Sequence, residues 1–202
     1  ADSDVVSQVL IDGPGQLRVL LAPISPDLAD YVTSAHITSL VDTLRRDFDF
    51  IVMDTPSYLT DVVIHAIELA DHIVMMTDLS VPGIKNARLT RGVLTAVGID
   101  PTKVMVVANH RETAGELDRR GAETFLGAQI AVEIPYAADL IATSINKGVP
   151  FVLSSPDADA TTALRSVLEA IDPLSRTSSE AASNGRIAGR KKGRRRKLSF
   201  SR

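Results

Sequence analysis

Three polar side chains follow directly after apolar runs in this 202-residue sequence: Asp54, Asp78 and Asn109. A carboxylate at such a position can hold the water shell of a Mg²⁺ ion that neutralises nucleotide phosphates. An amide can read the edge of a purine, because it pairs a donor with an acceptor. Structural roles compete with both readings, since Asp also begins turns and caps helices, and Asn closes turns.

The elements that must position these side chains are five short runs rich in β-branched residues, at 17–22, 48–53, 72–77, 104–108 and Ile130–Ile134. The first four are nearly continuous rather than alternating, which predicts parallel strands buried on both faces. Helical periodicity fills the intervening stretches, at 34–46, 60–70, 86–97 and 159–171.

Strand, helix and strand at this spacing predict right-handed βαβ units. We therefore expect an α/β fold of three layers, with an open, mostly parallel sheet and helices on both faces. In such sheets ligands bind beyond the carboxyl ends of the strands, which is where Asp54, Asp78 and Asn109 fall.

Composition narrows the classes of site. The chain has no cysteine, which excludes a disulfide framework or a thiolate metal site, and its four histidines show no metal-ligand spacing. No apolar run approaches the roughly 18 residues of a membrane span, and no signal peptide is evident. We expect a cytoplasmic protein, and the first residue, Ala rather than Met, suggests that the chain begins inside a longer gene product.

Charge divides the chain into an acidic body and a basic end. Nine of the 22 Lys and Arg residues lie between Arg186 and Arg202, a segment without acids, so the remaining 13 face all 25 acidic residues. We predict a domain over residues 1–174 and a disordered basic tail over 175–202. The tail could contact anionic lipid or nucleic acid at low salt; the alternative is a solvated tail, since only Leu198 and Phe200 offer apolar anchors.

Several motifs in collinear order resemble the MinD/ParA group of deviant-Walker P-loop ATPases. FDFIVMDTP is similar to the Walker B strand and the start of switch II, and further matches follow in LRVLLAP, HIVMMTDLSVPGIKNAR and VMVVANHR. The segment with the spacing IPY…A…NKGVP…P is most similar to CpaE/TadZ-like pilus-assembly members. The resemblance covers about residues 17–171 and implies a P-loop NTPase-like sheet.

The resemblance implies a role for each matching residue near the phosphates. Asp54 corresponds to the Walker B acid, a catalytic residue that binds Mg²⁺ through water. Thr55 and Pro56 correspond to the switch that senses the γ-phosphate, and we assign Asp61 to the same switch. Ser57 stands where the family often has a second proline.

On the base side, Asn109 corresponds to the asparagine that contacts adenine, and Pro135 lies where the next loop borders the base. Ala137 replaces an acid that often follows the IPY motif.

The phosphate-binding loop of the family has no counterpart in these 202 residues. Gly13-Pro14-Gly15 precedes a strand-like run instead of opening a helix, and no GK[ST] occurs. That loop would supply backbone N–H groups and a lysine to the phosphates. We therefore expect the loop and the first strand upstream, ATP and Mg²⁺ to bind only with them, and this chain alone to be inactive and poorly stable, with two unpaired strand edges.

Three functions remain open. The first is an ATP-dependent switch that localises or assembles an envelope machine, such as a type IV (Flp/Tad) pilus or secretion system, and forms a homodimer on nucleotide binding. The second is a nucleotide-independent scaffold that retains the fold, and the third is a ParA-like DNA-partitioning ATPase. We expect the protein in the cytoplasm, including peripheral sites at the inner face of the membrane.

Overall fold

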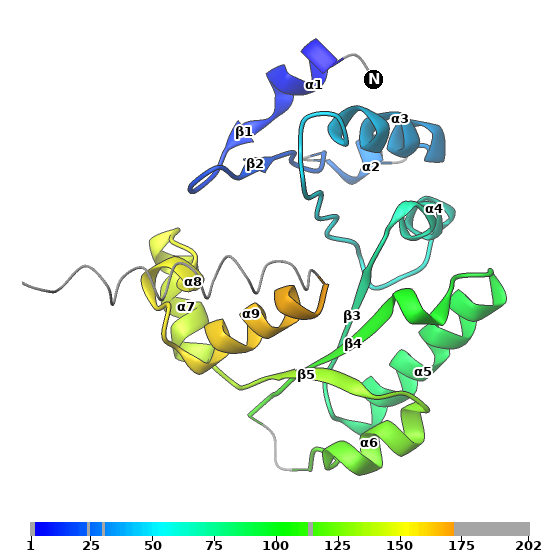
Figure 1. Cartoon of the computed structure of the whole chain (residues 1–202), viewed down its shortest axis with the longest axis vertical. Helices are drawn as coiled ribbons and strands as arrows, with labels where there is room; N and C mark the ends of the chain where they lie inside the picture. Colours follow the sequence, from blue (N-terminus) through cyan, green and yellow to red (C-terminus); the bar gives the residue numbers. More distant parts are fainter. Residues whose placement is uncertain (1–2, 24, 30, 113–114, 172–202) are drawn as a thin grey trace, which may run out of the picture. The chain divides into compact units, whose positions relative to one another are not determined.

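A computed structural model describes residues 3–23, 25–29, 31–112 and 115–171. The chain divides into two compact units. The first comprises Ala1–Ile73 and Thr90–Val104, and the second comprises Val74–Leu89 and Met105–Arg202. Figure 1 shows the elements in chain order.

The first unit contains a short hairpin and helices. Strands β1 (Ile11–Asp12) and β2 (Arg18–Val19) pair antiparallel, after helix α1 (Ser3–Val9) and before helix α2 (Pro26–Ala29). Helices α3 (Ser34–Leu44) and α4 (Asp61–Leu69) follow, as the apolar periodicity predicts. A 3-10 turn, η1 (Pro101–Lys103), lies before β4.

Caps and side-chain bonds define the two longer helices of the first unit. Thr33 and His36 form a reciprocal capping box at the start of α3, and the Thr60 hydroxyl accepts a hydrogen bond from the backbone of Val63 at the start of α4. Cationic side chains close the end of α4. Arg45 donates to the carbonyl of Leu69 at 2.9 Å, and Lys103 donates to that of Ala70 at 3.1 Å.

Two predicted strands of the first unit are not formed as expected. The run 17–22 contributes only the two residues of β2, and Leu21 is 67% exposed. Residues 51–56 have no strand structure, and Val52 is 92% exposed. The physical reason is the lack of neighbours: a strand buried on both faces needs a hydrogen-bonded partner and covering helices, and no described strand pairs with 48–54.

The second unit is built on a three-stranded sheet in the order β3-β4-β5. The strands are β3 (Ile73–Thr77), β4 (Val104–Asn109) and β5 (Ile130–Ile134), which confirms the last three predicted strands. β4 and β5 run parallel, with Val107 opposite Val132 and Asn109 opposite Ile134. A register shift lies between Val106 and Val107.

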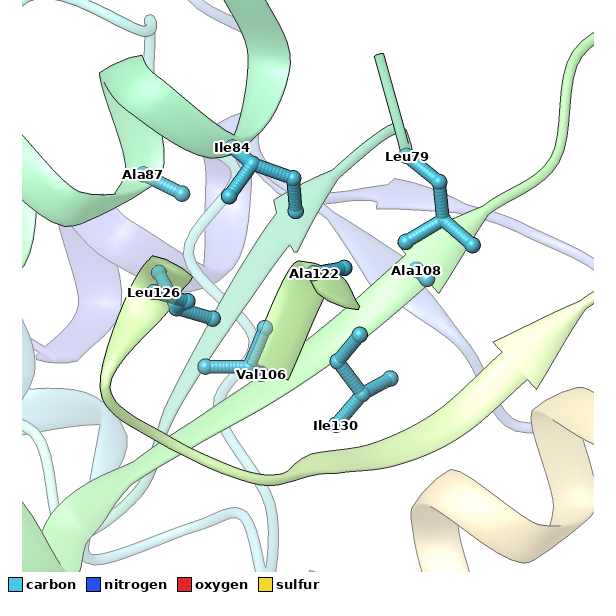
Figure 2. Packing of buried hydrophobic residues seen from close by; sticks show 8 residues of the cluster. All are labelled: Leu79, Ile84, Ala87, Val106, Ala108, Ala122, Leu126 and Ile130. Carbon is cyan, nitrogen blue, oxygen red and sulfur yellow. The ribbon is translucent and has the colours of Figure 1, made fainter. Parts of the chain in front are cut away.

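Helices cover both faces of this sheet. Alternate residues of β4 face opposite ways: Val106 and Ala108 join one apolar cluster and Val107 joins the other. The first cluster includes residues of α5 (Val81–Ala96) and α6 (Arg119–Leu126), and the second includes residues of α9 (Asp159–Ile171). Figure 2 shows the packing of the first cluster: Leu79, Ile84, Ala87, Val106, Ala108, Ala122, Leu126 and Ile130. The expected three-layer α/β arrangement is confirmed in this unit.

Some helices of the second unit differ from the prediction. α5 begins at Val81 rather than near Asn86, because the Ser80 hydroxyl accepts a hydrogen bond from the backbone of Gly83 at 3.1 Å. Helices α6, α7 (Ala138–Lys147) and α8 (Phe151–Ser154) were not predicted. α6 begins at the cap Asp118 and ends at Gly127, whose φ of 69° suits glycine.

Residues 172–202 lie outside the described residues, so the basic tail and the boundary near 174 stay predictions. Within the described residues, we find no helix whose length and hydrophobicity would let it span a bilayer.

Candidate nucleotide site

Two predicted base-binding residues lie side by side in the second unit. Asn109 is the last residue of β4 and stands opposite Ile134, the residue before Pro135. The backbone of His110 donates to the carbonyl of Ile134 at 2.9 Å, which extends the β4–β5 ladder by one bond. Asn109 is exposed although Ala108 beside it is fully buried, so a rigid strand presents the amide to solvent. This arrangement suits recognition of a flat, polar edge.

His110 lies next to this pair and bridges two carboxylates. Its Nδ1 is 2.8 Å from an oxygen of Glu116, and its Nε2 is 2.8 Å from an oxygen of Glu133 on β5. The hydrogen bonds to Glu116 and then Glu133 raise the pKa of His110, against the opposing effect of burial. The sequence analysis did not find this residue, since its partners are 6 and 23 positions away and follow no motif.

Asp78, the third polar residue at a strand end, has a structural role. One oxygen accepts hydrogen bonds from the backbone and the hydroxyl of Ser80, and the other accepts from Arg111 at 3.1 Å. The Ser80 hydroxyl is the main cause that lowers the pKa of Asp78, with Arg111 adding to it. A Cβ at Gly83 would lie 2.2 Å from Asp78 Oδ1, so the turn requires glycine there. Of the two readings, turn formation therefore fits Asp78.

The predicted phosphate-side residues lie in the first unit. Asp54, Thr55 and Pro56 are exposed in an irregular segment, and Asp61 is exposed in the first turn of α4. An acid at that helical position also favours the positive end of the helix, which is a structural alternative for Asp61. The structure thus brings Asn109 and Pro135 together in one unit and holds the four switch residues in the other.

The donor chemistry around Asp54 fits a hydrated Mg²⁺ ion. Within the described part of the chain, we find no hydrogen bond or ion pair that occupies the Asp54 carboxylate, and Thr55 adds a hydroxyl oxygen. Both are hard oxygen ligands of the kind that Mg²⁺ prefers. The described residues include no group of three or more His, Cys, Asp or Glu side chains able to hold a metal. A Mg²⁺ ion here would therefore depend on water and nucleotide phosphates for its remaining ligands.

Comparison with solved structures defines the class of fold. The chain is similar to the ParA family ATPase from Chlorobium tepidum TLS, with a TM-score of 0.74 and 15% identity, covering 81% of this chain and 68% of that one. It is also similar to MinD from Pyrococcus horikoshii OT3, solved with Mg-ADP, with a TM-score of 0.71 and 15% identity over 86% of this chain and 73% of that one. The fold is that of the MinD-like P-loop NTPases.

Sequence comparison then narrows the class. The chain is 28% identical over 154 residues to a protein of Emiliania huxleyi that carries the name of the septum site-determining protein MinD, covering 73% of this chain and 56% of that protein. No family model matches. The chain is a relative of the MinD/ParA-type superfamily of deviant-Walker ATPases, and it spans about half the length of the curated relatives it matches.

The finer resemblance to CpaE/TadZ-like proteins is not among these findings. The relatives found are MinD and ParA proteins, and a MinD from Aquifex aeolicus, similar with a TM-score of 0.61, 20% identity and coverage of 69% of this chain and 59% of that one, was solved in complex with MinC.

Proposed function

We propose that this chain is the C-terminal portion of a nucleotide-dependent switch of the MinD/ParA type. The observation that carries the proposal is the register of β4 and β5, which sets the exposed Asn109 beside Pro135 at the carboxyl ends of two parallel strands. Ligands of open α/β sheets bind at this edge. The shared fold with a MinD solved with Mg-ADP supports a nucleotide as the ligand.

The phosphate side of the proposed site consists of Asp54, Thr55, Pro56 and Asp61. Asp54 holds the hydrated metal, and the segment from Thr55 to Asp61 changes conformation with the state of the γ-phosphate. When bound, Mg²⁺ neutralises part of the phosphate charge. The exposed, irregular backbone of 51–60 supports a switch role, because a segment with few packing contacts can be reordered at little cost.

On the base side, Asn109 reads the adenine edge and Pro135 packs beside the ring. The phosphate-binding loop that completes such a site has no counterpart in the 202 residues. The proposal therefore assigns phosphate binding to a segment of the gene product outside this chain.

For the cellular role, we propose a switch that forms a homodimer with nucleotide and positions an envelope machine from the cytoplasmic side of the membrane. A pilus or secretion system is favoured by one specific feature, the IPY…NKGVP spacing from Ile134 to Pro150. A nucleotide-independent scaffold is favoured instead by the lack of a GK[ST] motif in this chain. DNA partitioning is favoured by the similarity to a ParA family ATPase.

The deciding experiment measures ATP binding and turnover by the full-length gene product. We expect Asp54→Ala to lower turnover by about a hundredfold or more, the usual effect of losing a group that stabilises transition-state charge. Asp49→Ala, which removes another exposed carboxylate from the same segment, is the matched control and should leave turnover unchanged.

Each alternative has its own outcome in the same set of measurements. Turnover that survives Asp54→Ala would remove Asp54 from the mechanism. A full-length protein that binds no ATP would establish the scaffold instead. DNA affinity that persists at physiological salt would favour partitioning over an envelope role.

A further inference from the structure

The imidazole of His110 is held between two carboxylates that belong to different elements. Glu116 lies in the connection between β4 and α6, and Glu133 lies on β5. Both ring nitrogens are 2.8 Å from a carboxylate oxygen, and the side chains of Glu116 and Glu133 are only 15% and 29% exposed. We call these three residues the His110 clasp.

The hydrogen-bond pattern of the clasp determines where the proton lies. The second oxygen of Glu116 accepts from the backbone of Arg111 at 3.1 Å, and the second oxygen of Glu133 accepts from Arg119 at 3.0 Å. All four carboxylate oxygens thus face N–H donors. A protonated carboxyl would turn one acceptor into a donor, so the extra proton belongs on the ring. The clasp closes fully only around an imidazolium ion.

The clasp joins the two residues proposed to contact the base. Asn109 directly precedes His110, and Pro135 is two positions after Glu133. The backbone bond from His110 to Ile134 lies between them. Loss of the ring proton would leave a lone pair facing a carboxylate, and one of the two bonds would open.

We propose that His110 is a positioning residue that fixes the ends of β4 and β5 while it carries a proton, so that selectivity for adenine at Asn109 and Pro135 declines as pH rises. This inference rests on the proposed nucleotide site. It concerns regulation of that site and adds no residue that touches the nucleotide.

The charged surroundings of the clasp come from each element packed around it. Besides Glu116 and Glu133, they include Asp78 after β3, Arg111 after β4, and Arg119 and Glu123 on α6. Arg111 bonds to Asp78, and Arg119 is shared by Glu123 and Glu133. Since these arginines stay charged across the working range of pH, His110 is the member of the network whose charge changes near neutrality.

The direction of the pH effect follows from the raised pKa of His110. A group with a raised folded-state pKa stabilises the fold fully below its unfolded value, here 6.5, and loses that contribution as pH rises through the folded value. The clasp is therefore closed at pH 6 and opens on the alkaline side of the His110 titration.

The first test titrates His110 by NMR in the full-length protein labelled at histidine. The resonance lost in His110→Gln identifies the residue. We expect its pKa to lie above 6.5 and to fall by about one pH unit or more in Glu116→Gln, which removes one charged partner. Glu112→Gln is the matched control, because Glu112 bonds to Tyr136 rather than His110. An ordinary titration in the wild type, or the same fall in both variants, would overturn the clasp.

The second test measures the ratio of the GDP to the ADP dissociation constant between pH 6 and pH 9. The ratio isolates the base contacts, because phosphate protonation affects both nucleotides alike. We expect the ratio to fall by about two- to tenfold as His110 titrates, the effect of about one hydrogen bond, and to be low and independent of pH in Glu116→Gln.

The two tests separate this inference from the proposed function. A constant ratio in a wild type that binds both nucleotides would overturn the positioning role while leaving the nucleotide site in place. If His110 titrates as expected but no nucleotide binds at any pH, the proposed function fails, and the positioning role fails with it.

Discussion

Val107 and Val52 show how differently the two units use similar apolar runs. Val107, in β4 of the second unit, is fully buried among residues of a cluster that includes α9. Val52, in the first unit, sits in a run of the same character and is 92% exposed. The difference is in the neighbours: β4 has a strand on each side and helices over both faces, whereas 48–54 pairs with no described strand. An apolar run becomes a strand only when other elements satisfy its backbone.

The largest expected effect breaks or upholds this contrast directly. Val107→Asp would bury a carboxylate without a partner in the core of the second unit, and we expect a loss of more than about 4 kcal/mol in the free energy of unfolding. Val52→Asp should change it by less than about 0.5 kcal/mol. Urea denaturation of the full-length protein measures both. A large loss in Val52→Asp would show that 48–54 is a buried strand in the folded protein.

A smaller effect tests how tightly the second unit is built at the start of α5. Gly83→Ala would set a Cβ 2.2 Å from an Asp78 oxygen and 2.9 Å from the Asp78 carbonyl oxygen, and we expect a loss of about 1–3 kcal/mol.

Gly92→Ala on the same helix is the matched control. Its Cβ would meet nothing within 4 Å, so we expect a gain of about 0.5–1 kcal/mol from helix propensity. Thermal unfolding of the two variants checks both signs, and equal effects would refute the close contact at Gly83.

The smallest effect concerns the first unit. Thr60→Ala removes the hydroxyl that accepts the backbone N–H of Val63 at 3.3 Å, and we expect a loss of about 1 kcal/mol in the stability of α4. Thr60→Ser keeps the cap and serves as the control. Amide hydrogen exchange should show faster exchange in α4 but not in α6, whose cap is Asp118. Acceleration in both helices would mean that the units unfold as one.

The sequence predicts the second unit better than the first for a physical reason. The runs at β3, β4 and β5 find partners close in the chain, so their hydrophobicity alone specifies strands. α6 was missed because its sequence, RRGAETFL, is mostly polar and buries only Ala122 and Leu126. The short α8 has only four residues, too few for a periodic pattern.

The candidate site was predictable where it depends on the chain alone. Asn109 and Pro135 end two apolar runs, and parallel register then brings them together. The His110 clasp was not predictable, because it depends on how the connection after β4 folds back to bring Glu116 to the ring. The roles of Asp54, Thr55, Pro56 and Asp61 remain proposals that the experiments above test.

The exposed run from Phe50 to Met53 has a consequence for handling the protein. It combines high β propensity with unpaired backbone groups and no proline, the features of a segment that templates intermolecular strands. Aggregation of the isolated chain should therefore rise steeply with concentration. A single charge introduced at Val52 should act as a gatekeeper and extend the time that the chain stays in solution.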